Sequence, residues 1–244
     1  MRLDEALVAA GLAPSRARAR DMVLRGAVSV DGRPAEKPAQ RVGAAEKLTV
    51  MDPAARYVSR AALKLAAGLD AFGFSPAGLT AVDLGASTGG FTQVLLERGA
   101  AHVIAVDVGH GQLDPALAAH PRLTVIEGVN ARDLTEAQLG GRPIEAIVSD
   151  VSFISLKLAL PPALAMAEPG AWGVFLVKPQ FEVGRALVGK GGIVRDPAVA
   201  RQAAEAIAVW LGAATDWHAV GLLPSPLAGG DGNLEFLLGA RRNG

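Results

Sequence analysis

The sequence contains no cysteine among its 244 residues. This excludes disulfide bonds, zinc sites built on thiolates and thiol nucleophiles, together with every pyrimidine C5-methylation mechanism that needs a catalytic cysteine. Long apolar runs are also missing. One of the longest, residues 171–177, is far too short to span a bilayer, and the N-terminus lacks the charged-then-apolar pattern of a signal peptide. We therefore expect a cytoplasmic protein without a membrane segment.

The formal net charge is zero, but the charges are unevenly distributed along the chain. Residues 1–60 carry 11 lysines and arginines against 7 aspartates and glutamates, a net charge of +4, whereas residues 61–244 carry 13 against 17, a net charge of −4. With 50% hydrophobic residues, the chain can bury the cores of one large and one small domain. We predict a small basic domain at residues 1–55, a linker at 56–62 and a large domain at 63–244.

A glycine-rich loop follows an apolar run early in the large domain. Residues 79–84 fit a buried strand, the loop follows it, and a helix is expected from Phe91 to Arg98. Such a loop has few side chains that would keep a ligand away, and the new helix offers free backbone N–H groups. A second strand ends near Asp107, 22 residues after Gly85, where a carboxylate can bind the hydroxyls of a ribose. The pattern predicts a nucleoside-cofactor site, with a simple turn as the alternative.

The loop sequence also distinguishes between cofactors. Dinucleotide-binding loops follow G-x-G-x-x-G, whose second glycine lets the pyrophosphate approach the backbone, and Ser87 stands at that position here. The acid two residues before the loop, Asp83, is instead similar to the first motif of S-adenosylmethionine-dependent methyltransferases. We predict S-adenosyl-L-methionine as the cofactor, bound by Asp83, Gly85, Ala86, Ser87, Thr88, Gly89, Gly90, Phe91 and Asp107.

The large domain alternates strands and helices. Further strands are expected at residues 123–127, 144–150, 171–178, 217–223 and 233–238. This predicts an α/β fold: a class I, Rossmann-like methyltransferase with a seven-stranded, mostly parallel sheet, preceded by a small α+β domain. Ligands of such sheets bind at the carboxyl ends of the strands. Asp150 and Lys178, each the last residue of a predicted strand, should therefore share a crevice with the glycine loop.

Methyl transfer to a hydroxyl requires a group that polarises or deprotonates it, because a neutral hydroxyl is a poor nucleophile. Two lysines and two carboxylates are candidates: Lys64, Asp150, Lys178 and Glu235. Lys64 is by pattern more typical of a surface lysine beside an apolar helix face, and Glu235 also fits an exposed position of the last strand. Lys178 is harder to explain structurally, because a lysine rarely ends a fully buried strand.

The N-terminal region predicts two helices followed by short strands. Apolar spacing indicates a helix at residues 3–10, and Ser15 is suited to cap a second helix that runs to Leu24. Strands are expected at residues 28–30 and 48–50. The arginines of this region fit either a solvated surface or a phosphate-binding face, and the candidates are Arg2, Arg16, Arg18, Arg20 and Arg25.

The ordered motifs resemble those of a known family. In the small domain, residues 2–4, 15–16, 26–32 and 37–38 are similar to the alpha-L RNA-binding motif of a small-subunit ribosomal protein and of many RNA-modifying enzymes. In the large domain, the matching segments are residues 56–65, 83–92, 107–112, 150–155, 178–182 and 232–235. Over nearly its whole length the chain resembles the TlyA (haemolysin A-like) ribosomal RNA 2′-O-methyltransferases, which have an FtsJ-type domain behind the RNA-binding domain.

The resemblance implies S-adenosylmethionine-dependent 2′-O-methylation of cytidine in ribosomal RNA, with large-subunit RNA as substrate and small-subunit RNA as a second candidate. It carries the family's Lys-Asp-Lys-Glu tetrad onto Lys64, Asp150, Lys178 and Glu235. Lys178 would lie nearest the hydroxyl, Asp150 and Glu235 would be its electrostatic partners, and Lys64 would be an orienting cation. The resemblance also places Asn130 at the cofactor's adenosine and implies that the N-terminal arginines bind ribosomal RNA or ribosomal subunits.

Two other functions remain open on the sequence alone. One is a membrane-active, haemolysin-like protein, since relatives carry that label, although residues 156–167 are interrupted by Pro161 and Pro162 and no strongly basic amphipathic helix is evident. The other is an RNA-binding protein without catalytic activity. Leakage of liposomes would support the first, and a failure to bind or consume S-adenosylmethionine would support the second.

Overall fold

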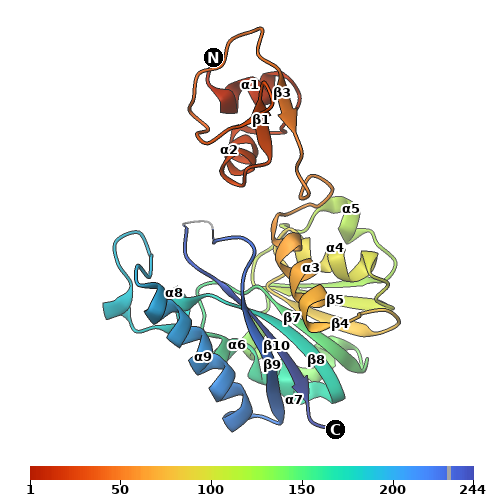
Figure 1. Cartoon of the computed structure of the whole chain (residues 1–244). Helices are drawn as coiled ribbons and strands as arrows, with labels where there is room; N and C mark the ends of the chain where they lie inside the picture. Colours follow the sequence, from red (N-terminus) through yellow and green to blue (C-terminus); the bar gives the residue numbers. More distant parts are fainter. Residues whose placement is uncertain (230–231) are drawn as a thin grey trace. The chain divides into compact units, whose positions relative to one another are not determined.

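The computed structural model describes residues 1–229 and 232–244. The chain divides into two compact units, Met1–Arg56 and Tyr57–Gly244 (Figure 1), and each is described by itself. Within the described residues, every helix is too short or too polar to cross a lipid bilayer.

The first unit packs two helices against a small antiparallel sheet. Its elements are α1 (Leu3–Ala9), α2 (Arg16–Leu24), β1 (Val28–Val30), β2 (Arg33–Pro34) and β3 (Leu48–Val50), and the strand order is β2-β1-β3. Ser15 caps α2, since its side chain accepts a hydrogen bond from the backbone N–H of Arg18. Leu3, Leu7 and Met22 belong to the apolar cluster between the helices and the sheet. The helices and strands predicted for this region are confirmed.

The second unit is built on a seven-stranded sheet. Its strands are β4 (Thr80–Leu84), β5 (His102–Asp107), β6 (Leu123–Glu127), β7 (Ile144–Ser149), β8 (Ala167–Val177), β9 (Trp217–Pro224) and β10 (Phe236–Arg242). They lie in the order β6-β5-β4-β7-β8-β10-β9, with β10 antiparallel to β8 and β9 and the other pairs parallel. The predicted class I fold is confirmed. The strand order reverses between β4 and β7, so the ligand crevice is expected at their carboxyl ends.

Helices cover both faces of this sheet (Figure 1), as the alternation of strand side chains requires. The elements on one face are α3 (Ala61–Phe72), α4 (Gly90–Glu97) and α5 (Pro115–Ala118). Those on the other are the short helices η1 (Ala131–Asp133) and η2 (Glu136–Leu139), then α6 (Leu156–Ala159), α7 (Pro161–Met166) and α9 (Pro197–Ala214). In β7, Ala146 and Val148 pack with α3 and α4, whereas Ile147 packs with α6 and α9. The remaining elements, α8 (Pro179–Glu182) and η3 (Arg185–Leu187), follow β8.

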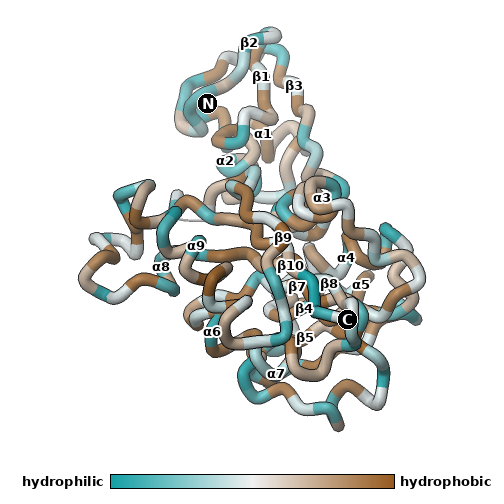
Figure 2. The backbone as a smooth tube through the Cα atoms, turned by 60° about the horizontal axis from the view of Figure 1, so that its bottom comes forward, coloured by the Kyte–Doolittle hydropathy of each residue, from teal (hydrophilic) through white to brown (hydrophobic). Residues whose placement is uncertain are grey.

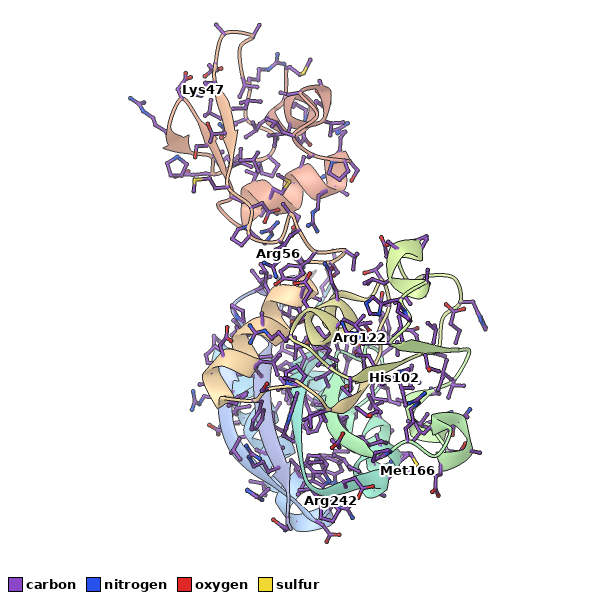
Figure 3. The ribbon with its side chains drawn as sticks, turned by 90° about the vertical axis from the view of Figure 1, so that its right-hand side faces the viewer. Lys47, Arg56, His102, Arg122, Met166 and Arg242 are labelled. Carbon is purple, nitrogen blue, oxygen red and sulfur yellow. The ribbon has the colours of Figure 1, made fainter. Side chains whose placement is uncertain are left out.

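Local signals explain where the helices begin and end. Asp196 caps α9 by accepting a hydrogen bond from the backbone N–H of Ala198 (2.8 Å), and Pro197 is its first residue, as its fixed φ favours. Most of α9 is apolar, with hydrophilic residues in its first half (Figure 2), and its buried residues Ala200, Ala204, Ile207 and Leu211 recur at helical spacing. Arg122, labelled in Figure 3, holds the end of α4 by donating hydrogen bonds to the carbonyl oxygens of Leu96 (3.3 Å) and Ala100 (2.6 Å).

The last strand begins later than the predicted residues 233–238. Glu235 lies directly before β10 and not on it. The reason is the partner strand: Phe236 pairs with Val177, the last residue of β8, and the chain turns into α8 at Pro179, so the ladder has no partner for Glu235. Just before it, the side chain of buried Asn233 accepts a hydrogen bond from the backbone N–H of Val194 (2.9 Å) and donates one to the carbonyl oxygen of Gly192 (2.9 Å).

Candidate active site

The glycine loop joins β4 to α4 at the carboxyl end of the sheet. Gly85 has a φ of +81°, and a Cβ at this residue would lie 3.0 Å from the backbone of Val151 on the loop after β7. Gly89 has a φ of +95°, and a Cβ there would lie 2.6 Å from the side chain of Leu117. Both positions therefore require glycine, because of the left-handed backbone and the close approach. The glycine loop thus lies directly against the loop that begins with Asp150.

Asp107 ends β5, and its carboxylate turns towards the glycine loop. One oxygen accepts a hydrogen bond from the backbone N–H of Ser87 (2.7 Å), and the other accepts one from Gly109 (2.7 Å). A carboxylate oxygen can accept a second hydrogen bond, so both remain able to bind hydroxyls. The position of Asp107 fits the ribose-binding acid that the spacing predicts.

Two adjoining cavities lie at this end of the sheet, with volumes of about 450 Å³ and about 160 Å³. The larger volume falls within the range of small-molecule sites. The residues that line both cavities are Gly85, Ser87, Asp150 and Ser152. The larger one is also lined by Asp107 and Asn130, and the smaller one by Ala86, Thr88, Gly90, Phe91 and Lys178. Of the predicted cofactor residues, Asp83 and Gly89 line neither cavity, and both are buried.

Asp83 is fully buried on β4, two residues before the glycine loop. Its Oδ2 accepts a hydrogen bond from the hydroxyl of Thr92 (2.7 Å), whereas its Oδ1 has no hydrogen-bond partner among the described residues. Burial raises the pKa of Asp83 to about 7; the Thr92 hydrogen bond opposes this, and the negative charges of Asp150 and Asp107 add to it. An orphaned, buried carboxylate oxygen beside the loop suits a ligand that carries an ammonium group.

The Asp83→Asn variant is expected to change how stability depends on pH. Because the pKa of Asp83 is raised from 3.8 to about 7 in the folded protein, the folded state binds a proton more tightly than the unfolded chain, and its contribution to stability falls as pH rises from 4 to 7. The free energy of unfolding of the wild type, relative to Asp83→Asn, should therefore drop by more than about 1 kcal/mol between pH 5 and pH 7. Urea unfolding at both pH values measures this. Equal differences at the two pH values would show that Asp83 is ionised throughout.

Lys178 and Asp150 directly follow β8 and β7, because each strand ends one residue earlier than predicted. The Nζ of Lys178 lies 2.7 Å from Oδ1 of Asp150. It donates hydrogen bonds to the hydroxyl of Ser152 (2.8 Å) and to the carbonyl oxygen of Asp150 (3.3 Å). Asp150 Oδ1 is buried and accepts no hydrogen bond of good geometry from the described residues, so its contact with Nζ is an ion pair. The lysine nitrogen is thus fixed at the wall of the smaller cavity, beside a carboxylate oxygen that can accept a further hydrogen bond.

Lys64 and Glu235 form a second ion pair. Lys64 lies on α3 and Glu235 precedes β10, and Nζ lies 2.5 Å from Oε2. Their side chains are only 7% and 3% exposed, so the pattern that favoured a surface lysine is misleading here. The predicted pairing of Glu235 with Lys178 is corrected, because Glu235 is bonded to Lys64. The four residues therefore form two pairs, Lys64–Glu235 and Asp150–Lys178.

Three residues of the site were not predicted from the sequence. Ser152 holds Lys178, and Thr92 holds Asp83. Phe153 lines the larger cavity, is 91% exposed, has its ring centroid 5.2 Å from that of Phe181, and has a φ of +64°. Such a conformation is unfavourable for a non-glycine residue and is concentrated at functional sites. All three lie inside motifs that the sequence singles out, but no spacing rule distinguishes them there.

Buried Asp4 organises two of the predicted RNA-binding arginines. Arg2 lies 2.9 Å from one oxygen of Asp4, and Arg16 lies 3.3 Å from the other. Their side chains nevertheless remain 40% and 54% exposed. The two guanidinium groups are therefore oriented but still accessible to a phosphate.

The other arginines differ in accessibility. Arg20 is exposed, and Arg18 is half-buried and donates a hydrogen bond to the carbonyl oxygen of Ala54 (2.9 Å). Arg25 has a side chain that is only 9% exposed, and it is bonded to Asp52 (2.7 Å) and Asp21 (2.8 Å). We therefore correct the prediction for Arg25, because its guanidinium group is nearly buried between these two carboxylates, whereas Arg16, which contacts Glu5 as well as Asp4, stays 54% exposed.

Comparisons with known proteins cover both units. A family model of FtsJ-like methyltransferases matches residues 57–242, and a model of the S4 domain matches residues 1–48. The 16S/23S rRNA (cytidine-2′-O)-methyltransferase TlyA of Mycobacterium tuberculosis is 49% identical, over 98% of this chain and 89% of its own. Hemolysin A of Brachyspira hyodysenteriae is 38% identical, over 97% of this chain and 98% of its own. A solved structure of a Streptococcus thermophilus protein described as a hemolysin has a TM-score of 0.78 and 36% identity, covering 100% of this chain and 88% of that one.

Proposed function

Because the chain belongs to the TlyA family of FtsJ-like methyltransferases, we propose that it methylates the 2′-hydroxyl of a cytidine in ribosomal RNA. The resemblance of its motifs to this family is confirmed. The Mycobacterium tuberculosis relative is named for RNA of both ribosomal subunits. Large-subunit RNA is the substrate that we test first, and small-subunit RNA is the second.

The position of Lys178 carries this proposal. Its Nζ is held by Asp150 and Ser152 at the wall of the smaller cavity, and the glycine loop forms another wall of that cavity. In the proposed reaction, Lys178 first releases to solvent the proton that it carries in the ion pair, and as the neutral amine it then accepts the proton of the 2′-hydroxyl while the oxygen attacks; Asp150 and Ser152 hold its nitrogen in place. We propose a supporting electrostatic role for the buried Lys64–Glu235 pair.

S-adenosylmethionine, when bound, supplies the electrophilic methyl group. The residues present fit this group, because Asp107 lines the larger cavity and its carboxylate oxygens can each accept a further hydrogen bond from a ribose hydroxyl; Asp83, fully buried two residues before the glycine loop, leaves one carboxylate oxygen without a partner among the described residues and would add negative charge near the ammonium end. We propose that Asn130 and the larger cavity hold the adenine end, and that the glycine loop and the smaller cavity hold the amino-acid end. The exposed ring of Phe153 offers a stacking surface for a nucleobase at the edge of the larger cavity.

The test uses methyl-labelled S-adenosylmethionine with large subunits, small subunits and naked ribosomal RNA that all lack the modification. We expect label in ribosomal RNA, and the preferred substrate identifies which form is recognised. If none of the three is labelled although the protein binds the RNA, the chain is a non-catalytic RNA-binding protein. Because a relative carries the name hemolysin, leakage of dye-loaded liposomes is measured in parallel, and leakage would favour the membrane-active alternative.

The first unit is proposed to bind RNA through its accessible arginines. Replacing Arg16 and Arg20 together by alanine should weaken binding to a ribosomal RNA fragment, because each arginine would bind one phosphate. The slope of log K against log salt should decrease by about 1 for each phosphate that is no longer bound. Fluorescence anisotropy between 50 and 300 mM KCl (roughly the range over which such slopes are resolved) measures both effects. Arg201→Ala on α9 is the matched control, and an equal weakening in this control would contradict the assignment.

A further inference from the structure

Lys178 and its partners Asp150 and Ser152 come from two chain segments. A second set of hydrogen bonds connects the same two segments at another point. Asp150 lies on the loop between β7 and α6, and Lys178 starts the turn that forms α8. At the end of α8, the carboxylate of Glu182 accepts hydrogen bonds from the hydroxyl of Ser155 (2.5 Å) and from the backbone N–H of Leu156 (2.8 Å). Ser155 and Leu156 form the start of α6, so Glu182 links the far ends of both segments.

The helical turn α8 connects Glu182 rigidly to Lys178. The carbonyl oxygen of Lys178 accepts a hydrogen bond from the backbone N–H of Phe181 (2.9 Å), and that of Pro179 accepts one from Val183 (3.0 Å). Lys178 and Glu182 therefore sit at the two ends of one closed helical turn. Fixing the carboxylate of Glu182 consequently fixes the backbone from which the Lys178 side chain extends.

A ring contact connects the same two segments. Phe153, from the loop after β7, packs against Phe181 of α8 with ring centroids 5.2 Å apart. Glu182 itself lines neither of the two cavities at the cofactor site, but lies in a separate groove of about 230 Å³ between α8 and α9. Burial of this carboxylate is unfavourable, and it raises the pKa of Glu182. Glu182 is thus a buried acid that accepts two hydrogen bonds where α8 meets the start of α6, and it lies outside both cavities of the cofactor site.

We propose that Glu182 is a positioning residue: it holds α8 against the start of α6 and so sets the position of Lys178 Nζ relative to Asp150 and Ser152. The consequence for catalysis rests on the proposed function, since Lys178 is the group that would bind the hydroxyl. Misplacing a reacting group by about 1 Å can cost about 100-fold in rate. Removal of the link should therefore lower kcat without removing any group that touches a ligand.

Two variants separate positioning from charge. Glu182→Ala removes both hydrogen bonds, and we expect kcat for methyl transfer to fall about 30-fold, while KM for RNA and Kd for S-adenosylhomocysteine change less than about 3-fold. Glu182→Gln keeps both bonds, because its amide oxygen can accept from Leu156 and its amide nitrogen can donate to the Ser155 hydroxyl. We expect its kcat to lie within about 3-fold of the wild type. Glu205→Ala, an exposed acid paired with Arg201 on α9, is the matched control.

A second measurement does not depend on turnover. The resonance of Lys178 Cε in ¹³C-lysine-labelled protein, assigned with a Lys178→Arg sample, should shift in Glu182→Ala and stay unchanged in Glu182→Gln and Glu205→Ala. If the wild type proves inactive but these shifts occur, the positioning role stands and the proposed function fails. The positioning role is overturned if Glu182→Ala leaves the Lys178 resonance unmoved, or if its kcat stays within about 2-fold of the wild type. It is also overturned if Glu182→Gln loses as much kcat as Glu182→Ala.

Discussion

Replacing Lys178 by alanine should lower kcat for methyl transfer about 1,000-fold, which lies within the range attributed to a positioned acid or base. The structure explains why the loss should concern the chemical step. Lys178 Nζ is held by Asp150 and Ser152 beside the smaller cavity, and Lys178 does not line the larger cavity that we assign to the adenosine. Affinity for S-adenosylhomocysteine, measured by calorimetry, should therefore fall far less than kcat.

The Lys178→Arg variant distinguishes the two ways in which this lysine can act. Arginine retains the positive charge but cannot accept a proton from a hydroxyl. If Lys178 receives the proton, as we propose, Lys178→Arg should be about as inactive as Lys178→Ala. Substantial activity in the arginine variant would instead indicate that the charge alone stabilises the developing oxyanion. Lys157→Ala, which removes an exposed lysine on α6, is the control and should retain wild-type kcat.

Breaking the Lys64–Glu235 pair should lower the free energy of unfolding more than any other substitution proposed for this protein. Both side chains are less than one-tenth exposed, and the pair joins α3 to the residue before β10, 171 positions away. Removing one partner leaves the other as an uncompensated buried charge, which costs about 3–5 kcal/mol. We expect losses of this size in the free energy of unfolding for Lys64→Ala and for Glu235→Ala. Urea unfolding followed by tryptophan fluorescence reports on the second unit, since Trp172, Trp210 and Trp217 all lie in it.

A double replacement separates stability from catalysis at this pair. Lys64→Met with Glu235→Leu removes both charges and retains apolar volume, so most of the free energy of unfolding should be restored. Methyl transfer should not return if the pair supports the reaction electrostatically. A double variant that is both stable and fully active would show that the pair is only structural. Single variants that are destabilised by less than about 1 kcal/mol would show that water reaches these charges.

The sheet and the glycine loop were predictable because short-range patterns determine them. The apolar run before Gly85, the left-handed turn at Gly89 and the spacing to Asp107 all follow from local backbone requirements. Asp150 and Lys178 were brought together by one topological rule, since parallel strands end at the same edge. The residue that holds them, Ser152, follows no such rule.

The pairings across long sequence separations were not predictable. Helix periodicity placed Lys64 beside an apolar face and favoured a solvated side chain, whereas its partner Glu235 comes from the far end of the chain. Arg25 resembled its neighbours in sequence, but Asp52 and Asp21 bury and occupy it. In both cases the partner decides the role, and the partner is known only once the chain has folded.

The most direct test of the central claim is the identity of the methylated atom. Ribosomal RNA labelled by the wild type is digested to nucleosides and analysed by mass spectrometry, in parallel with RNA treated with Lys178→Ala. We predict 2′-O-methylcytidine in the first sample and none in the second. A methyl group on the base, or equal 2′-O-methylcytidine from both proteins, would contradict the assignment of a hydroxyl acceptor activated by Lys178.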